Sequence, residues 1–412
     1  MARFRLKYPM LDVPAAWHLS GQDLAQVDFR LERLGPGNSV FVRAALAIVM
    51  WLALRLGRLR LFGVTIIARD ADVTQVLGDP AQFPVPFGGD MRLLAHGPPG
   101  IDADPALRPV FMLGADGPEH ASQRALVFAA MQHCAASQSR FVGDTSVIAA
   151  ALIANCDGQI DIMRDVFARV SAQTGAEWLG LAVPDIDAYS DWTLAMSAML
   201  FGDPAGNAVI RELAQHGGWR LRALIDGRIA QCAAQLAPLP PAARDEIAAT
   251  RGLIWALVAA RLDQNAVLSP ADHALIRAII TGMVIGLGPT TTLAGGKAFA
   301  WLLRHPAAFA LAQAAATAGD RDAMRRIVLE AARMAPALDP GQFRTGAGDT
   351  VVLAATAAAL RDGRRWPSPG RFDPDRWIGQ ENAPNLLFGH GIHACISQHM
   401  AVDQLTSIFA LL

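Results

Sequence analysis

Residues 388–399 read Phe-Gly-His-Gly-Ile-His-Ala-Cys-Ile-Ser-Gln-His, and this stretch decides how the rest of the chain is interpreted. Its two glycines allow a tight backbone turn, and a single cysteine, Cys395, stands just before a segment of helical character. A thiol at the N-terminus of a helix lies where the helix dipole and the free N–H groups stabilise a thiolate. The pattern therefore indicates a presented thiolate, which is a soft ligand for a metal.

Three other interpretations of this loop stay open from these residues alone. The side chains of His390, His393, Cys395 and His399 are all of types that bind zinc, although their spacing matches no common zinc module. Cys395 could instead act as a nucleophile with a histidine as its base. A lone cysteine is also commonly an inert, buried side chain.

Composition excludes several classes of protein. The chain has 412 residues, of which 52% are apolar and 18% are charged, so it is neither disordered nor fibrous and can form a large core. A net charge of −1 argues against a general nucleic-acid binder. Four cysteines without C-x-x-C spacing, and no apolar leader at the N-terminus, favour a cytoplasmic protein with reduced thiols.

Two apolar stretches resemble membrane spans by composition. Residues 44–54 are uncharged but too short to cross a hydrocarbon core of about 30 Å. Residues 278–296 also lack charge, yet they contain five glycines, four threonines and a proline, whereas a lipid-facing helix is usually richer in leucine and isoleucine. We therefore expect the second stretch to be a buried central helix and the chain to have no transmembrane span.

Periodicity predicts a mainly helical chain with a small β portion, forming one domain over residues 1–412. Residues 1–40 show little pattern, and residues 84–118 are expected to form a long loop rich in proline and glycine. Two short strands are expected within residues 58–68 and another over 351–355. Helices are expected over 41–56, 70–77, 119–133, 159–180, 187–200, 206–235, 243–263, 270–304, 307–317, 321–334 and 396–411.

The cysteine loop resembles the F-G-x-G-x-H-x-C loop that binds haem in the cytochrome P450 family. Glu330-Ala-Ala-Arg333 resembles the E-x-x-R of that family, and Pro369-Gly-Arg371-Phe372 resembles the P-x-R-F segment that follows it. Residues 116–124, Asp-Gly-Pro-Glu-His-Ala-Ser-Gln-Arg, resemble the start of the family's C helix. The ordered resemblance covers about residue 58 to the C-terminus, and it implies a cytochrome P450-like fold around a buried haem.

The resemblance also implies roles for individual residues. Cys395 would be the axial thiolate ligand of haem b, iron-protoporphyrin IX, whose electron donation to the iron favours O–O cleavage. Glu330, Arg333 and Arg371 would form a buried ion-pair network that holds the cysteine loop. The remaining residues expected to contact the cofactor are His120, Arg124, Arg344, Phe388, Gly389 and His393.

Two positions depart from the family pattern. Residues 286–292, Gly-Leu-Gly-Pro-Thr-Thr-Thr, stand where the family usually has (A/G)-G-x-(D/E)-T. This register puts Thr290 at the usual catalytic threonine, with Thr291 as the fallback, and Pro289 at the usual acid. Proline carries no proton and removes a backbone N–H, so it is expected to kink the helix. Ser397 stands where the family usually has glycine.

The resemblance places the substrate pocket along residues 84–115, 195–218 and 279–291. Its apolar side chains imply a hydrophobic small molecule or a lipid as substrate. Arginines 361, 364, 365, 371 and 376 are candidates for docking an acidic, ferredoxin-type electron donor. The apolar candidates for the pocket are Phe87, Met91, Leu93, Leu94, Met196, Met199, Leu200 and Phe201.

The function that the resemblance implies is a monooxygenase. It would insert one oxygen atom of dioxygen into a hydrophobic molecule with electrons from an external donor. Pro289 favours an alternative, a peroxide-driven peroxygenase or an enzyme that rearranges hydroperoxides. A second alternative is a non-catalytic haem protein that needs a partner, because the sequence ends at Leu412, before the terminal β portion that the family usually adds.

Overall fold

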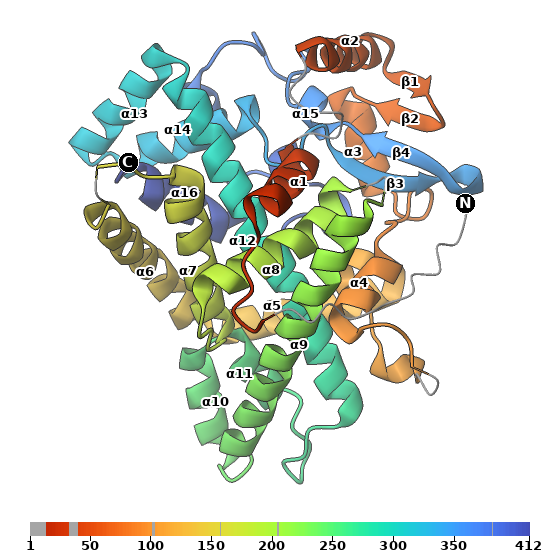
Figure 1. Cartoon of the computed structure of the whole chain (residues 1–412), viewed down its shortest axis with the longest axis vertical. Helices are drawn as coiled ribbons and strands as arrows, with labels where there is room; N and C mark the ends of the chain where they lie inside the picture. The colour runs from red at the N-terminus through yellow and green to blue at the C-terminus, as the bar shows by residue number, and fades with distance from the viewer. Residues whose placement is uncertain (1–13, 33–39, 101–103, 157, 204–205, 381) are drawn as a thin grey trace.

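The computed structural model describes residues 14–32, 40–100, 104–156, 158–203, 206–380 and 382–412 (Figure 1). Helices dominate, and one small sheet lies at an edge of the molecule. The α-helices are α1 (Gly21–Glu32), α2 (Val40–Leu56), α3 (Asp70–Gly78), α4 (Gly88–His96), α5 (Gly117–His133), α6 (Ala135–Ala154), α7 (Arg169–Leu179), α8 (Ile186–Ser197), α9 (Ala208–Leu236), α10 (Pro241–Arg251), α11 (Leu253–Ala259), α12 (Pro270–Leu303), α13 (Pro306–Ala318), α14 (Arg321–Met334), α15 (Thr356–Ala359) and α16 (Gln398–Phe409).

Short helical segments connect these elements. Two are π-helical, η3 (Ile162–Ala168) and η4 (Ala198–Gly202). The short 3₁₀ helices are η1 (Pro105–Leu107), η2 (Met112–Gly114), η5 (Ala347–Asp349), η6 (Pro374–Trp377), η7 (Leu386–Phe388) and η8 (Gly391–His393). The last two flank the turns of the cysteine loop.

The sheet joins two distant parts of the chain. Its strands, β1 (Arg58–Leu61), β2 (Val64–Ile67), β3 (Gln342–Gly346) and β4 (Thr350–Ala354), lie in the order β1-β2-β4-β3. β2 pairs in parallel with β4, with Val64 opposite Val351, whereas the outer pairs are antiparallel. The sheet therefore brings the N-terminal part of the chain beside the segment that precedes the cysteine loop.

Helix α12 runs through the middle of the molecule (Figure 1). Ser269 caps it, since its hydroxyl accepts the Asp272 N–H at 3.0 Å, and Pro270 occupies the first turn. Among the described helices it alone is long and apolar enough to cross a membrane, but 72% of its most apolar stretch is buried within the protein. Its apolar character is thus that of a core helix, as expected, and it continues as one helix through Pro289.

The structure corrects three expectations about the elements. Residues 84–118 are not one loop, because they contain α4, whose Met91 and Leu94 are buried one turn apart. Helix α6 was not predicted, although Phe141 and Ala149 on it are buried. The helix expected over 243–263 is divided at Gly252, which has a φ of 104° and would, with a Cβ, approach the Trp178 carbonyl oxygen to 2.5 Å.

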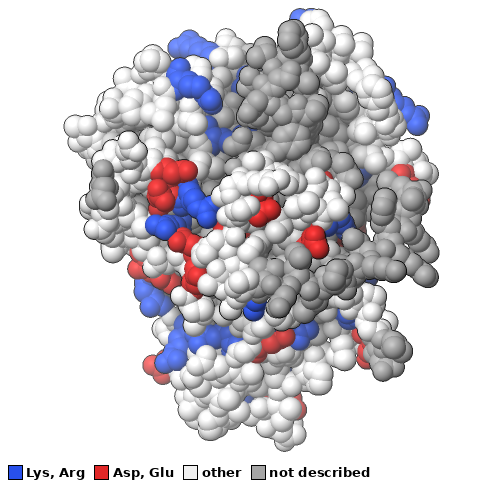
Figure 2. Space-filling model, viewed as in Figure 1, with Lys and Arg blue, Asp and Glu red and all other residues white. Residues whose placement is uncertain are grey.

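Residues 1–40 contain one described helix, α1, where no pattern was expected. The expectations for residues 1–13 and 33–39 lie outside the described residues. Acidic and basic side chains are interspersed over the face seen in Figure 2, in keeping with a net charge near zero.

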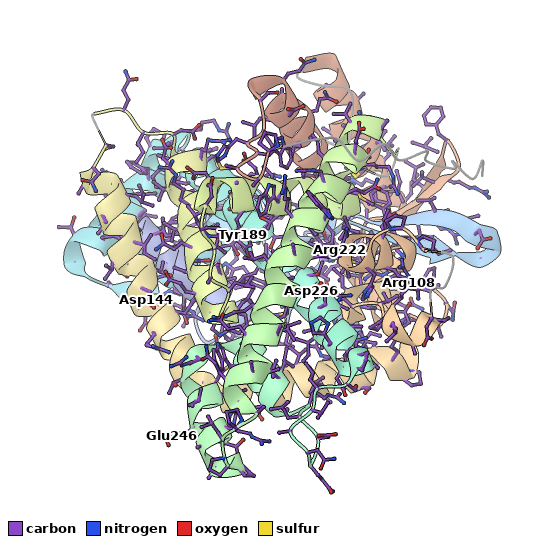
Figure 3. The ribbon with its side chains drawn as sticks, turned by 60° about the horizontal axis from the view of Figure 1, so that its bottom comes forward. Arg108, Asp144, Tyr189, Arg222, Asp226 and Glu246 are labelled. Carbon is purple, nitrogen blue, oxygen red and sulfur yellow. The ribbon has the colours of Figure 1, made fainter. Side chains whose placement is uncertain are left out.

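A polar cluster of His96, Arg222, Asp226 and Arg277, called the α4 latch below, holds α4 against α9 and α12. Figure 3 shows Arg222 and Asp226 one turn apart on α9. Arg222 donates to the Leu94 carbonyl at 3.0 Å, and Arg277 on α12 donates to Asp226 at 2.6 Å. Arg277 also contacts Nδ1 of His96 at 3.3 Å. These bonds fix the segment after β2 over the central helix.

Candidate active site

The cysteine loop is shaped by two glycines. Gly389 and Gly391 have φ values of 77° and 69°, in the left-handed region that favours glycine. A Cβ on Gly391 would lie 2.7 Å from the Leu77 carbonyl oxygen. The Cys395 N–H donates to the Phe388 carbonyl at 2.8 Å and closes the loop. The glycines therefore fix the direction in which the cysteine leaves the backbone.

The Cys395 thiol lines a cavity that is partly open to solvent. The residue is solvent-accessible, yet desolvation by the surrounding protein raises the pKa of its thiol. These observations agree if the accessible surface faces an internal space, and the cavity lining indeed includes Cys395. The Ser397 hydroxyl lies 3.8 Å from the sulfur, and both it and Arg124 act to lower the thiol pKa.

The cavity has a volume of about 250 Å³ and lies between the cysteine loop and α12. Arg124, Arg344, His120 and His393 border it, and no carboxylate occurs among its described lining residues. The rest of its wall is mainly apolar. From α12 it is lined by Gly282, Met283, Gly286, Leu287, Thr290, Thr291 and Ala294.

Two arginines at the cavity lack a carboxylate hydrogen-bond partner among the described contacts. Arg124 donates to the Ala394 carbonyl at 3.1 Å. Arg344 donates to the Phe343 carbonyl at 2.9 Å and to the side-chain oxygen of Gln342 at 3.3 Å. Burial lowers the pKa of Arg344 to about 10, with Asp116 opposing that shift. Both guanidinium groups thus use neutral acceptors and can accept an anionic partner.

The two expected histidines lie together. The rings of His120 and His393 are 4.8 Å apart, edge to face. His393 Nε2 lies 2.8 Å from a carboxylate oxygen of Asp116, a residue that the sequence did not single out. Burial, opposed by that hydrogen bond and reinforced by Arg344, lowers the pKa of His393 to about 4. The signal for Asp116 was its place as the first residue of the segment that carries His120 and Arg124.

These residues fit a haem. A thiol facing a mainly apolar cavity is suited to axial ligation, and the guanidinium groups of half-buried Arg124 and buried Arg344 suit the two propionates. Phe388 and Gly389 line the same cavity beside the cysteine. The residues expected to hold the cofactor are therefore brought together around one space.

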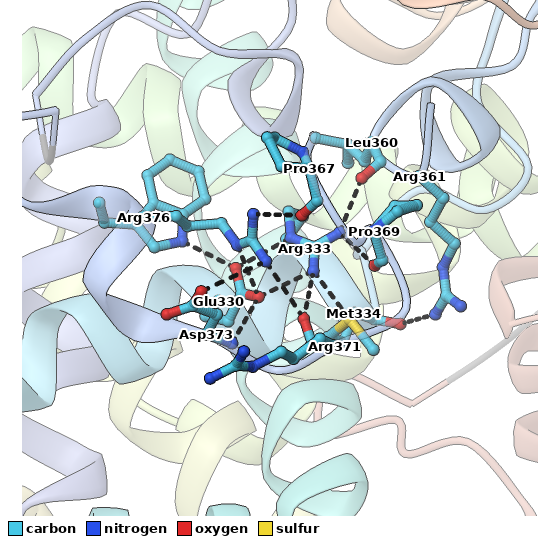
Figure 4. Close-up of polar contacts among 11 residues, drawn as sticks. Glu330, Arg333, Met334, Leu360, Arg361, Pro367, Pro369, Arg371, Asp373 and Arg376 are labelled. Atoms are coloured by element: carbon cyan, nitrogen blue, oxygen red, sulfur yellow. Dashed lines mark hydrogen bonds and ion pairs between the residues drawn. The ribbon is translucent and has the colours of Figure 1, made fainter. Parts of the chain in front are cut away.

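On α14, Glu330 and Arg333 form a buried ion pair (Figure 4). Both side chains are 0% exposed, and the pair is bidentate, with distances of 2.8 and 2.9 Å. Glu330 also accepts from the Trp377 indole at 3.0 Å, the Asp373 N–H at 3.0 Å and Arg376 at 3.1 Å. Arg333 further donates to main-chain carbonyls, so both charges are fully hydrogen-bonded.

The expectation that the Arg371 side chain belongs to this network is wrong. Arg371 is exposed and contributes its carbonyl oxygen, which accepts from Arg333 at 3.2 Å and from Arg376 at 3.3 Å. Figure 4 shows the second guanidinium beside Glu330 to be that of Arg376. The signal was in the sequence, because Pro374-Asp-Arg376-Trp377 also has a proline, an arginine and an aromatic residue at P-x-R-F spacing.

Successive threonines on α12 bond back to the preceding turn. The hydroxyls of Thr290 and Thr291 donate to the carbonyls of Gly286 and Leu287, the latter at 2.7 Å. Such bonds commonly bend a helix slightly. A Cβ added at Gly286 would meet no atom within 4 Å, so the space beside Thr290 is open. Pro289 is buried and is not among the lining residues, whereas both threonines line the cavity.

Only some of the apolar candidates reach the cavity. Phe87 and Phe201 line it, and their rings meet edge to face at 6.0 Å. Phe111, not predicted, also lines it, and its ring occupies the place that a side chain at Gly282 would take. Leu93 is half-buried and packs against the core cluster. The other candidates are buried core residues, namely Met91, Leu94, Met196, Met199 and Leu200.

The zinc interpretation finds no support in the described part of the chain. His399 contacts Asn382 at 3.1 Å, and His390 lies beside Gly78. Within the residues that the structure describes, no three His, Cys, Asp or Glu side chains group as metal ligands would.

Comparison with known proteins identifies a family and individual proteins that this chain resembles. The family model for cytochrome P450 matches residues 347–412. The chain is 28% identical to cytochrome P450 monooxygenase PikC of Streptomyces venezuelae over 95% of its length and 84% of that protein. It is also 28% identical to erythromycin C-12 hydroxylase of Saccharopolyspora erythraea, over 82% of this chain and 79% of the other.

The fold matches solved structures over most of its length. The open form of cytochrome P450 Eryk from S. erythraea superposes with a TM-score of 0.65 at 25% identity, covering 92% of this chain and 89% of that one. Loop, ion pair, fold and relatives agree, and the chain is similar over most of its length to cytochrome P450 monooxygenases.

Proposed function

We propose that this protein inserts one oxygen atom of dioxygen into an uncharged, hydrophobic small molecule, using electrons from an external donor. The observation that carries the proposal is that the Cys395 thiol and the Thr290 hydroxyl line the same, mainly apolar cavity. A thiolate-bound haem would supply the oxidising chemistry in that space. The surrounding side chains would bind the cofactor, exclude water and position the substrate.

Haem b is the cofactor that these residues suit. Cys395 would be its axial ligand, and Arg124, Arg344, His120 and His393 would hold its propionates through charge-assisted hydrogen bonds. The neutral acceptors that the two arginines now use leave their charge available for this role. Phe388 and Gly389 would pack on the cysteine side.

Thr290 is the residue that we assign to proton transfer. Its hydroxyl donates to the Gly286 carbonyl, and it can also accept a proton or a water from the open space beside that glycine. Thr291 bonds to the Leu287 carbonyl and is buried, so it is less accessible to a reactant. Thr290 therefore takes precedence over Thr291.

The apolar lining of the cavity indicates the class of substrate. Phe87, Phe111, Phe201, Met283 and Leu287 present apolar surface, and the charged groups gather where the propionates would lie. A charged substrate would lose hydration there without finding a partner. The name of one relative, vitamin D(3) 25-hydroxylase, supports an uncharged, hydrophobic substrate.

The electron donor that we propose is an acidic, ferredoxin-type protein in the cytoplasm. Arg365 and Arg371 are exposed and precede the cysteine loop, so they can steer an acidic partner toward it. Arg364 is exposed as well, although its guanidinium pairs with Asp362 at 2.9 Å. Two other arginines expected to contribute to donor docking already make contacts within the chain. Arg376 pairs with Glu330, and Arg361 donates to the Met334 carbonyl.

A peroxide-driven reaction is the second candidate. Its support is that the described lining of the cavity contains no carboxylate and that Pro289 replaces the usual acid. Peroxide already carries the electrons and protons that dioxygen must receive, so a weak proton path would matter less.

One comparison of oxidants tests both candidates. The ferric, haem-loaded protein is given hydrogen peroxide or a fatty-acid hydroperoxide without reductant, and in parallel dioxygen with NADPH, ferredoxin reductase and ferredoxin. A panel of hydrophobic substrates is present, and products are read by mass spectrometry. Product only in the ferredoxin arm supports the monooxygenase. Clean product from peroxide, with none in the ferredoxin arm, would replace it with the second candidate.

A further inference from the structure

Helix α2 and the turn between β1 and β2 expose large apolar side chains. Ile48, Trp51 and Leu56 are 59%, 55% and 61% exposed, and Phe62 at the tip of the turn is fully exposed. Leu46 and Leu52 on the same helix are also exposed. A contiguous apolar surface of this kind on a folded protein commonly marks an interaction site.

The exposed side of α2 is distinct from the side that packs against the rest of the protein. The opposite side of α2 packs on the sheet, where Ala53 is fully buried and Val49, Met50 and Leu54 contact the cluster formed by Ile66 and its neighbours. A helix at a water-exposed surface normally carries polar residues on its outer side. The outer side of α2 instead has no polar side chain from Ala44 to Leu54.

The turn between β1 and β2 also places a large apolar side chain in solvent. Phe62 has a φ of 48°, in the left-handed region, where a hairpin turn normally takes asparagine, aspartate or glycine. An aromatic side chain is unfavourable in this conformation and gains no burial here. A conformational cost without a packing benefit points to a contact made outside the chain.

The charges carried by α2 and the β1–β2 hairpin themselves are of one sign. Residues 40–69 contain five arginines and no aspartate or glutamate. Arg55, Arg58 and Arg60 are exposed, and Arg55 lies 5.1 Å from the centre of the Trp51 ring. Arg69 instead bonds to the carbonyls that end α2. The apolar face is thus bordered by cations and calls for a partner that is apolar and negative.

We propose that α2 and the β1–β2 turn lie in the interface of a membrane that contains anionic lipid. An apolar helix with tryptophan and flanking arginines has the composition of an interfacial helix. The apolar run is too short to span a bilayer, so the contact is peripheral. α2 and the turn lie at the same end of the molecule in Figure 1 and can reach one plane together.

A second copy of the chain fits this face less well. In a two-fold contact the same patch meets itself, so arginines of α2 and the hairpin would face arginines, with no acid within residues 40–69 to compensate. Anionic headgroups satisfy the arginines while the acyl boundary takes up Ile48, Trp51 and Phe62. Self-association is therefore an outcome of the test and not the proposal.

The test is co-sedimentation of the full-length, haem-loaded protein with vesicles. Vesicles of phosphatidylcholine with roughly a quarter phosphatidylglycerol are compared with pure phosphatidylcholine. We expect binding to the anionic vesicles that weakens markedly when salt rises from about 0.05 to 0.5 M. Ile48→Ser/Trp51→Ser should lower partitioning by roughly tenfold or more through lost apolar contact.

Two further variants make the test specific. Arg58→Gln/Arg60→Gln should lower binding to anionic vesicles only, by roughly fivefold for each charge removed. Val147→Ser is the matched control, because Val147 is 70% exposed on α6, away from this face, and should bind like the wild type. Thermal melting and the haem spectrum show that each variant is folded.

Three outcomes would overturn the proposal. The first is that wild-type protein sediments no more with anionic than with neutral vesicles at low salt. The second is equal binding by wild type and Ile48→Ser/Trp51→Ser. The third, read by sedimentation velocity without lipid, is a dimer that Ile48→Ser/Trp51→Ser dissociates and that does not bind vesicles. That result would assign the face to a second copy.

Discussion

The two walls of the haem cavity are built on opposite principles. On one side, α14 lines the cavity with Val328, Leu329 and Ala332, and its Glu330 and Arg333 beside them are fully buried, charged and hydrogen-bonded on every side. Across the cavity, residues 286–292 of α12 contribute glycine, proline and threonine, whose hydroxyls bond back to their own helix. The α14 side is thus stabilised by buried, paired charges, whereas this part of α12 is stabilised by packing and by hydrogen bonds from threonine hydroxyls to its own backbone.

The difference shows what each wall must do. The loop that presents Cys395 has little regular structure of its own, so it depends on a rigid support that tolerates no missing partner. Helix α12 is already stable through burial along its length and can accept an unusual sequence at its centre. Changes to the charged wall should therefore affect folding, whereas changes to α12 should affect the reaction.

The largest expected effect is at Cys395. Cys395→Ala removes the proposed axial ligand, so the reduced protein with carbon monoxide should lose the red-shifted Soret band of thiolate-bound haem. Difference spectroscopy of the purified protein measures this directly. Cys156→Ala, which removes a partly exposed cysteine elsewhere, should leave the band in place. An unchanged band in Cys395→Ala would remove the basis of the proposed site.

Next in size is the loss of one member of the buried network. Glu330→Gln leaves Arg333 and Arg376 without their shared carboxylate, and breaking such a buried pair typically costs about 3–5 kcal/mol. Denaturant unfolding should show this loss, together with weaker haem retention. Arg376→Gln should also destabilise the protein, because Arg376 is 9% exposed and bonded to Glu330.

Arg371→Gln is the matched control for this wall. The Arg371 side chain is exposed, so its removal should change the free energy of unfolding by no more than about 0.5 kcal/mol. Equal damage from Arg371→Gln and Arg376→Gln would restore the assignment that the sequence suggested and contradict the geometry.

This pair of arginines illustrates what the sequence could predict. The family motifs indicated the haem loop, the Glu330–Arg333 pair and the mainly helical fold, because each depends on residues close together in the chain. The choice between Arg371 and Arg376 depends on which side chain turns inward from an irregular segment. Two successive P-x-R patterns, at residues 369–371 and 374–376, leave that direction to tertiary packing.

The missed helices have a related cause. Proline and glycine before Gly88 made residues 84–118 resemble a loop, although Met91 and Leu94 have helical spacing. Asp116 was overlooked because its partner, His393, lies 277 residues away. Pairings of this kind are created by the fold, so local patterns do not reveal them.

On the α12 wall, Thr290→Ala should lower the product formed per dioxygen consumed by several-fold, because the hydroxyl beside the open space at Gly286 is lost. Oxygen consumption and product yield, measured together, give this ratio. Thr290→Ser keeps the hydroxyl and should restore most of the coupling. Thr291→Ala should have the smaller effect, since that hydroxyl is buried. The reverse order would move the register by one residue.

The smallest effect concerns the α4 latch. Burial, opposed by a hydrogen bond to the Pro109 carbonyl and reinforced by Arg277, lowers the pKa of His96 from 6.5 to about 4. Between these values the unfolded chain binds a proton that the folded protein does not. Stability from this group is therefore complete above pH 6.5 and is lost progressively as the pH falls toward 4.

His96→Gln should flatten this part of the pH profile. Glutamine can still accept from Arg277 but does not titrate, so the difference in melting temperature between pH 7 and pH 5 should be smaller than in the wild type. His133→Gln removes an exposed histidine from α5 and should keep the wild-type profile. If both variants kept that profile, acid sensitivity would arise elsewhere. The contact of α4 with α9 and α12 would then depend on the Arg222–Leu94 and Arg277–Asp226 bonds and not on His96.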